Sequence, residues 1–103
     1  MKLRVALAQI NPTVGDLTGN GALIADSVKS AQSHGANLIV FPEMIVTGYP
    51  VEDLALRPSF QVASKSALSA LASELDKKIV SIVGYLDHID GAPQNRVSAI
   101  TGG

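Results

Sequence analysis

Large apolar residues alternate with small or polar ones from Leu3 to Ala8, which predicts a first β-strand. Apolar residues then recur at helical spacing from Ile24 to Ala31, and this spacing predicts a helix over about residues 20–34. Gly35 follows where a left-handed C-terminal cap belongs. Residues 38–41 are apolar without alternation, as expected of a parallel strand that is covered on both faces.

The second half repeats this order. Pro58 suits the first turn of a second helix, because its missing N–H costs nothing there. Lys77 and Lys78 are expected at the end of this helix, where its dipole favours cations. Residues 79–85 predict a third strand, residues 87–93 a turn, and residues 94–100 a fourth strand. The expected inner stripe of the second helix is Phe60, Ala63, Ala67, Leu71 and Leu75.

The predicted fold class is α/β, with elements in the order β-α-β-α-β-β. Strands that alternate with helices predict a mostly parallel sheet, with both helices on one face through right-handed crossovers. Two helices cover only one face of such a sheet, so we interpret residues 1–103 as an incomplete domain. An uncovered face and an unpaired last strand predict self-association of the isolated chain.

Composition narrows the possible functions. Hydrophobic residues make up 47% and charged residues 17% of the chain, which argues against disorder. The net charge of −1 without a basic stripe argues against nucleic-acid binding, and no apolar run is long enough to span a membrane. There is no cysteine, there are only two histidines, and no signal-peptide pattern is present, so we expect no metal site and a cytosolic location.

The candidate chemistry lies where the second strand ends. Residues 38–41 run directly into Pro42 and Glu43, so the strand would deliver one carboxylate to the edge of the sheet. Its apolar neighbours suggest burial, which would favour a proton-accepting role near neutral pH. The alternative is a carboxylate that caps a turn. Glu52 and Asp53 could form a second acid pair, although they more readily begin a short helical turn.

Several motifs together carry a family resemblance. Residues 5–9, the element Phe41-Pro42-Glu43 and the pair Gly48-Tyr49 resemble the start of a carbon–nitrogen hydrolase domain of the nitrilase superfamily. The strings 47–54 and 57–60 resemble more particularly the N-terminal glutaminase domain of glutamine-dependent NAD synthetases. This resemblance covers the whole chain but only the first portion of an α-β-β-α sandwich domain.

The resemblance implies a Glu-Lys-Cys triad, in which Glu43 matches the glutamate and takes the proton of the cysteine. Tyr49 would help shape the glutamine site, and Asn95 would hold the backbone around it. The lysine and the cysteine of the motif are absent from the 103 residues, so we expect the isolated chain to be inactive. The resemblance also implies glutamine as the substrate, a homo-oligomeric parent protein, and a separate synthetase domain that uses ATP and Mg²⁺. We expect no cofactor in this chain itself.

Two other interpretations remain open. The chain could belong to a stand-alone amidase or nitrilase of the same superfamily. It could also be a non-catalytic interaction module that kept the scaffold and lost the triad, an interpretation suggested by the missing lysine and cysteine.

Overall fold

The computed structural model describes residues 3–75, 78–90 and 92–101, without the side chain of Asp53. In chain order the elements are β1 (Val5–Leu7), α1 (Leu17–Ser33), β2 (Leu38–Val40), the 3-10 helix η1 (Glu52–Leu56), α2 (Pro58–Glu74), β3 (Val80–Ile89) and β4 (Ala92–Ile100). The predicted α/β class and element order are confirmed.

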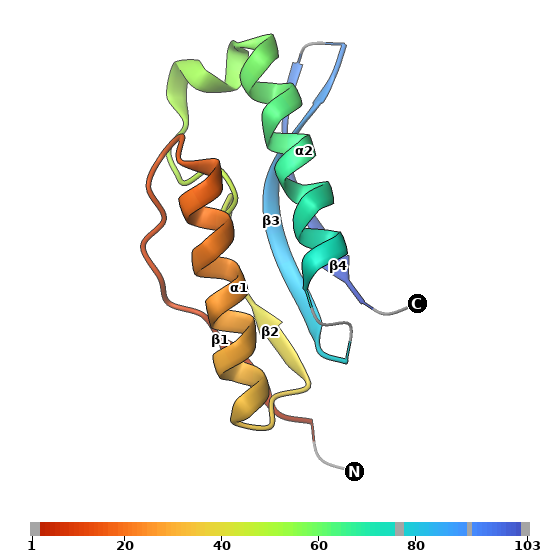
Figure 1. Cartoon of the computed structure of the whole chain (residues 1–103). Coiled ribbons are helices and arrows are strands. Elements are labelled where there is room, and N and C mark those ends of the chain that lie inside the picture. The colour runs from red at the N-terminus through yellow and green to blue at the C-terminus, as the bar shows by residue number, and fades with distance from the viewer. Residues whose placement is uncertain (1–2, 76–77, 91, 102–103) are drawn as a thin grey trace.

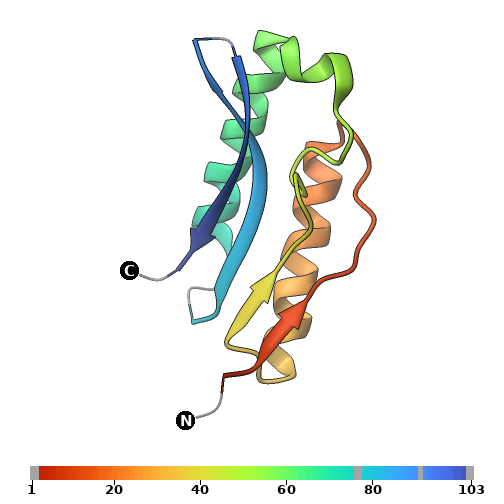
Figure 2. The same cartoon turned by 180° about the vertical axis from the view of Figure 1, so that it is seen from behind.

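The strands form one sheet in the order β1-β2-β3-β4. β1, β2 and β3 run parallel, whereas β4 is antiparallel to β3. Ala6, Ile39 and Ser81 lie beside one another in this register. Both helices lie side by side on one face of the sheet, as predicted, and none of the residues that the structure describes places a helix on the opposite face (Figures 1 and 2).

The predicted start of α1 is three residues late. The helix begins at Leu17 because the Asp16 carboxylate accepts a hydrogen bond from the N–H of Gly19 at 2.9 Å and so caps the first turn. Its end is confirmed. Gly35 has a positive φ of 79°, the left-handed conformation that glycine adopts most readily after a helix.

The start of α2 at Pro58 is confirmed, but its predicted inner stripe is wrong in part. Gln61 and Ser64 are buried while Ala63 is exposed. Polar side chains can occupy this face because they bond to neighbouring backbone: the Ser64 hydroxyl donates to the carbonyl of Leu86 at 3.2 Å. The helix ends at Glu74, so Lys78 lies beyond its last turn, and Lys77 is outside the described residues.

The third and fourth strands are longer than predicted. Residues 87–89 continue β3 instead of forming a turn, and β4 already begins at Ala92. The resulting hairpin pairs Ser81 with Ile100 at one end and Ile89 with Ala92 at the other. Polar residues near the tip led to the incorrect prediction, because their long-range partners cannot be read from local composition.

The hydrophobic core lies between the sheet and the two helices. Its fully buried members include Ile24, Ile39, Ile79 and Val83. The other face of the sheet is different: Val5, Leu7 and Val97 are 44%, 72% and 66% exposed. Exposed apolar side chains on a face where the described structure places no helix agree with the prediction of an incomplete nitrilase-like sandwich.

Candidate active site

The segment that follows β2 carries Glu43. It stays close to β3 after leaving the regular ladder, because the N–H of Phe41 donates to the carbonyl of Ile82 at 3.1 Å and the N–H of Val46 donates to Gly84 at 3.3 Å. Glu43 lies between these two attachments. Its backbone is therefore fixed on both sides at the carboxyl end of a parallel strand, where α/β folds commonly place their sites.

Gly84 makes room for this segment. A Cβ atom at Gly84 would lie 2.7 Å from the backbone nitrogen of Met44 and 3.2 Å from the carbonyl oxygen of Pro42. Met44 itself has a φ of 49°, a conformation that non-glycine residues rarely adopt. The chain thus turns sharply just after Glu43, pressed against a position of β3 that has no side chain.

Asn95 is the partner of the Glu43 carboxylate. Its side-chain N–H, carried by β4, donates a short hydrogen bond to Glu43 Oε1. The sequence resemblance suggested that Asn95 holds backbone, whereas the structure brings its amide onto the carboxylate. Two candidate residues that are 52 positions apart in the chain are therefore joined directly.

Asn20 fixes the far end of the same loop. Its side chain donates to the carbonyls of Thr13 at 2.8 Å and Val46 at 3.0 Å, and accepts from the N–H of Thr13 at 2.8 Å. Asn20 is almost completely buried, with 1% exposed. Sequence reasoning used this residue only as the predicted start of a helix. The available signal in the sequence was its position: Asn20 lies four residues before Ile24 and so falls on the predicted buried face of the helix.

Tyr49 is not joined to Glu43. Its side chain is 63% exposed, and within the described part of the chain no hydrogen bond links its hydroxyl to the carboxylate. Glu52 and Asp53 begin η1, as the helical-turn interpretation predicted, and Glu52 is exposed. The backbone of η1 gives no support to the alternative that Glu52 and Asp53 form a catalytic acid pair. The side chain of Asp53 lies outside the described residues.

The predicted burial of Glu43 is wrong. Pro42 and Glu43 are exposed, although residues 44–46 are buried. The apolar neighbours in the sequence point away from the carboxylate, because the turn at Met44 sends their side chains into the protein. Glu43 therefore lies at the surface with its hydrogen bond from Asn95, open to any group that approaches from that side.

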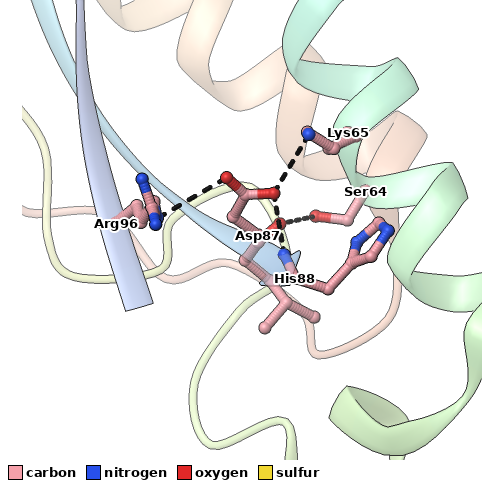
Figure 3. A network of polar contacts seen from close by, with 6 residues as sticks. Ser64, Lys65, Asp87, His88 and Arg96 are labelled. Atoms are coloured by element: carbon pink, nitrogen blue, oxygen red, sulfur yellow. Dashed lines mark hydrogen bonds and ion pairs between the residues drawn. The ribbon is translucent and has the colours of Figure 1, made fainter. Parts of the chain in front are cut away.

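A second polar cluster lies on the opposite side of the hairpin (Figure 3). The buried Asp87 carboxylate lies 3.2 Å from Lys65 Nζ of α2 and 3.5 Å from Arg96 Nε of β4, and accepts a hydrogen bond from the His88 N–H at 2.7 Å. The His88 N–H most of all, and then Lys65 and Arg96, hold the pKa of Asp87 below its usual value, although burial acts to raise it.

His88 belongs to β3 and not to the predicted turn. Its Nδ1 atom is buried without a hydrogen-bond partner in the described structure. Among residues 3–75, 78–90 and 92–101, no three histidine, cysteine or acidic side chains gather in a way that could hold a metal ion. No helix in the same ranges is long and apolar enough to cross a membrane.

The geometry at Glu43 suits proton transfer. An exposed carboxylate, oriented by one amide donor on a strand-end turn, can accept a proton from a group that arrives at the surface. As a proton acceptor, the Glu43 carboxylate would still need a separate nucleophile to act on a substrate. A thiol is absent from the 103 residues, so a cysteine nucleophile would have to come from elsewhere.

The carbon–nitrogen hydrolase family matches residues 4–101 of this sequence. The chain belongs to this family. The match covers nearly all of the chain and includes Glu43, Gly84 and Asn95. The family resemblance noted in the sequence is therefore confirmed.

Proteins of known name resemble the chain to different degrees. It is 39% identical over 92 residues to the glutamine-dependent NAD(+) synthetase of Thermotoga maritima, covering 88% of this chain and 16% of that protein. The crystal structure of a glutamine-dependent NAD(+) synthetase from Cytophaga hutchinsonii superposes with a TM-score of 0.89 at 25% identity, covering 96% of this chain and 17% of that one. The chain thus spans about a sixth of the length of these synthetases.

A nitrilase-superfamily relative is less similar. An amidase from Nesterenkonia sp. superposes with a TM-score of 0.70 at 25% identity, covering 94% of this chain and 36% of the amidase. Both comparisons confirm the nitrilase-like fold. The higher superposition score favours the synthetases over the amidase as structural relatives.

Proposed function

We propose that the chain contributes the proton-accepting glutamate to a glutaminase site that supplies ammonia to an NAD synthetase. The observation that carries this proposal is the hydrogen bond from Asn95 to Glu43 Oε1, at the strand end of a chain whose relatives include glutamine-dependent NAD(+) synthetases. Tyr49 remains a proposed glutamine-binding residue. Its exposed phenol is available to a substrate or to a further part of the protein.

The proposed reaction uses Glu43 twice. Glu43 Oε2 accepts the proton of a cysteine thiol from outside these residues, and the thiolate attacks the side-chain amide carbon of glutamine. The resulting tetrahedral intermediate expels ammonia, which takes the proton from Glu43 as the thioester forms. Water then attacks the thioester, gives a proton to Glu43, and releases glutamate as the thiol is regenerated.

The rest of the proposal concerns the whole protein. The ammonia would amidate nicotinic acid adenine dinucleotide in a synthetase domain that uses ATP and Mg²⁺. We further propose a cytosolic, homo-oligomeric enzyme. These elements rest on the similarity to the synthetases and on the sequence motifs.

The test compares two nitrogen sources in the protein that carries this chain and a synthetase domain. Glu43→Gln should lower glutamine-dependent NAD formation at least about a hundredfold, because removing a general base costs about that much. Ammonia-dependent NAD formation should stay within about twofold, since free ammonia bypasses the glutaminase step. Glu74→Gln makes the same chemical change at an exposed position at the end of α2 and should alter neither activity.

Three outcomes contradict the proposal in different ways. If both activities of Glu43→Gln fall together, Glu43 has a structural role. If glutamine-dependent synthesis persists, Glu43 is not the base. Hydrolysis of simple amides without any NAD formation would instead support the stand-alone amidase.

A further inference from the structure

The β3–β4 hairpin presents two different faces at the level of Glu43. Asn95 pairs with Leu86 and Arg96 pairs with Tyr85, so the two neighbouring β4 residues project to opposite sides of the sheet. On one side the Asn95 amide donates to Glu43. On the other side the Arg96 guanidinium reaches Asp87.

Asp87 connects three elements. Its two carboxylate oxygens lie 3.2 Å from Lys65 of α2 and 3.5 Å from Arg96 of β4, and its own strand supplies the His88 N–H (Figure 3). Next to it, the Ser64 hydroxyl donates to the carbonyl of Leu86. Helix α2 therefore contacts β3 through two consecutive residues, Ser64 and Lys65, which bond to Leu86 and Asp87. Leu86 is the residue of β3 that pairs with Asn95.

β4 has few other attachments in this region. It is the last strand in the order of the sheet, and its residues from Ala92 to Val97 are all exposed. Apart from the ladder with β3, the described structure holds this half of the strand through the Asn95–Glu43 hydrogen bond on one side and the Arg96–Asp87 pair on the other, and η1 lies close to β4. A shift of β4 would move Asn95 away from the Glu43 carboxylate.

We propose that Asp87, with Lys65 and Arg96, is a positioning cluster for Glu43: it fixes β4 against α2 so that Asn95 keeps its amide on the carboxylate. This inference rests on the proposed base role of Glu43. Asp87 acts only through Asn95, because it lies on the other side of the sheet from the loop that carries Glu43.

The expected sizes of the effects on stability and on catalytic rate distinguish a positioning role of the Asp87 cluster from a purely stabilising role. The side chains of Lys65 and Arg96 are 53% and 44% exposed, and ion pairs that open to water contribute little to stability. Catalytic geometry is far more sensitive, since a displacement of about 1 Å can cost about a hundredfold in rate. The small stability loss expected from such pairs leaves most molecules of a domain with ordinary stability folded, so a loss of kcat of about tenfold would not come from unfolding.

The experiment uses the whole enzyme and two Asp→Asn variants of the same hairpin. Asp87→Asn should lower kcat with glutamine about tenfold while KM for glutamine stays within about twofold, because orientation of the base is lost and substrate binding is not. Ammonia-dependent synthesis should not change. Asp90→Asn alters a carboxylate at the exposed hairpin tip, for which the described structure records no ion pair, and should behave as the unaltered enzyme.

A double-mutant cycle tests whether the effect passes through Asn95. Asn95→Ala alone should lower kcat, and adding Asp87→Asn should then have little further effect, because the positioned amide is already missing. Additive losses would overturn the inference, since they would show that Asp87 acts independently of Asn95. Asp87→Glu should recover part of the lost kcat by restoring the negative charge.

A surface variant covers the case in which Asp87→Asn does not fold. Arg96→Gln removes an exposed guanidinium and should show the same selective loss of kcat with glutamine; unchanged kcat would overturn the inference. The proposed role of Glu43 as the base is tested separately, by Glu43→Gln. If Glu43→Gln abolishes glutamine use but Asp87→Asn matches Asp90→Asn, only the positioning role fails.

Discussion

Gly84 shows how one missing side chain places a carboxylate. The backbone of residues 42–44 lies against it so closely that a methyl group would lie 2.7 Å from the Met44 nitrogen. That neighbour is backbone and cannot rotate away. The loop after β2 can therefore follow β3 and bring Glu43 to Asn95 only because position 84 is glycine.

Gly84→Ala should destabilise the fold by about 1–3 kcal/mol, as is typical when extra volume is forced into a packed site. It should also lower glutamine-dependent activity by displacing Glu43. Gly21→Ala is the matched control: its Cβ would lie 4.0 Å from Leu71 and it sits within α1, so it should stabilise the protein by about 0.5–1 kcal/mol. Urea unfolding of both variants provides the measurement, and equal effects would contradict this explanation.

Asn20 supports the same loop from its other end. Asn20→Ala would leave the buried carbonyl of Val46 without this donor, whereas the Thr13 carbonyl still accepts from the Asp16 N–H and Thr13 is exposed to water. One buried unsatisfied group costs about 1–3 kcal/mol, so a loss of about 2 kcal/mol is expected. Asn37→Ala removes a single bond to the exposed Arg4 N–H and should cost about 1 kcal/mol or less. Thermal or urea unfolding that shows similar losses would refute the assigned role.

Among the secondary-structure elements, α2 and the hairpin are coupled by a group that titrates. The pKa of Asp87 is lowered in the folded protein, so the ionised carboxylate stabilises the fold above the ordinary aspartate pKa of about 4. This contribution is lost as the pH falls through the lowered pKa. The groups that face Asp87 are Lys65, Arg96 and the backbone of His88.

Asp87→Asn should therefore cost about 1–2 kcal/mol at pH 7, within the range of hydrogen bonds to a charged group. The difference from the unaltered protein should begin to shrink below about pH 4, where the carboxyl of the unfolded chain becomes protonated, and should disappear at the lower pH at which the native carboxyl is protonated as well. Urea unfolding at pH 7, 4 and 2.5 measures this difference. Asp90→Asn should show no such dependence, and a difference that stays constant at low pH would exclude the titration of Asp87 as its source.

The elements also show what sequence reasoning could reach. Apolar patterns identified the strands and both helices: Ile24 belongs to a helical repeat, whereas Ile39 and Val83 lie in short apolar runs, and all three are buried. It failed for Ser64 and Asp87, whose burial depends on partners far away in the chain. Glu43 shows both sides of this limit: the motif identified the residue, but a single positive φ at Met44 decided its exposure.

For the whole molecule, the uncovered sheet face dominates behaviour in solution. Leu7 and Val97 are large apolar residues that stay exposed on this face, and β1 and β4 leave open edges on either side. Exposed apolar faces and unpaired edges both favour association. The purified 103-residue chain should therefore form dimers or larger species, detectable by light scattering at micromolar concentrations.

Leu7→Lys combined with Val97→Lys should reduce this association, since each change places a charge on the open face. Lys substitutions at Val62 and Leu56, which are exposed outside the sheet, provide the control and should leave association unchanged. A monodisperse monomer of the unaltered chain would contradict the importance of this face. The same chain should release no glutamate from glutamine, because it holds no thiol.

The alternation along β4 makes the hairpin connection a point of unusual sensitivity. Removing one residue between Ile89 and Ala92 would shift the later strand by one position and exchange the sides occupied by Asn95 and Arg96. A permanent cation would then face the Glu43 carboxylate, and an uncharged amide would face Asp87. Deletion of a single residue in the hairpin connection, far from the reacting atoms, would thus turn Glu43 from a proton acceptor into one partner of an ion pair.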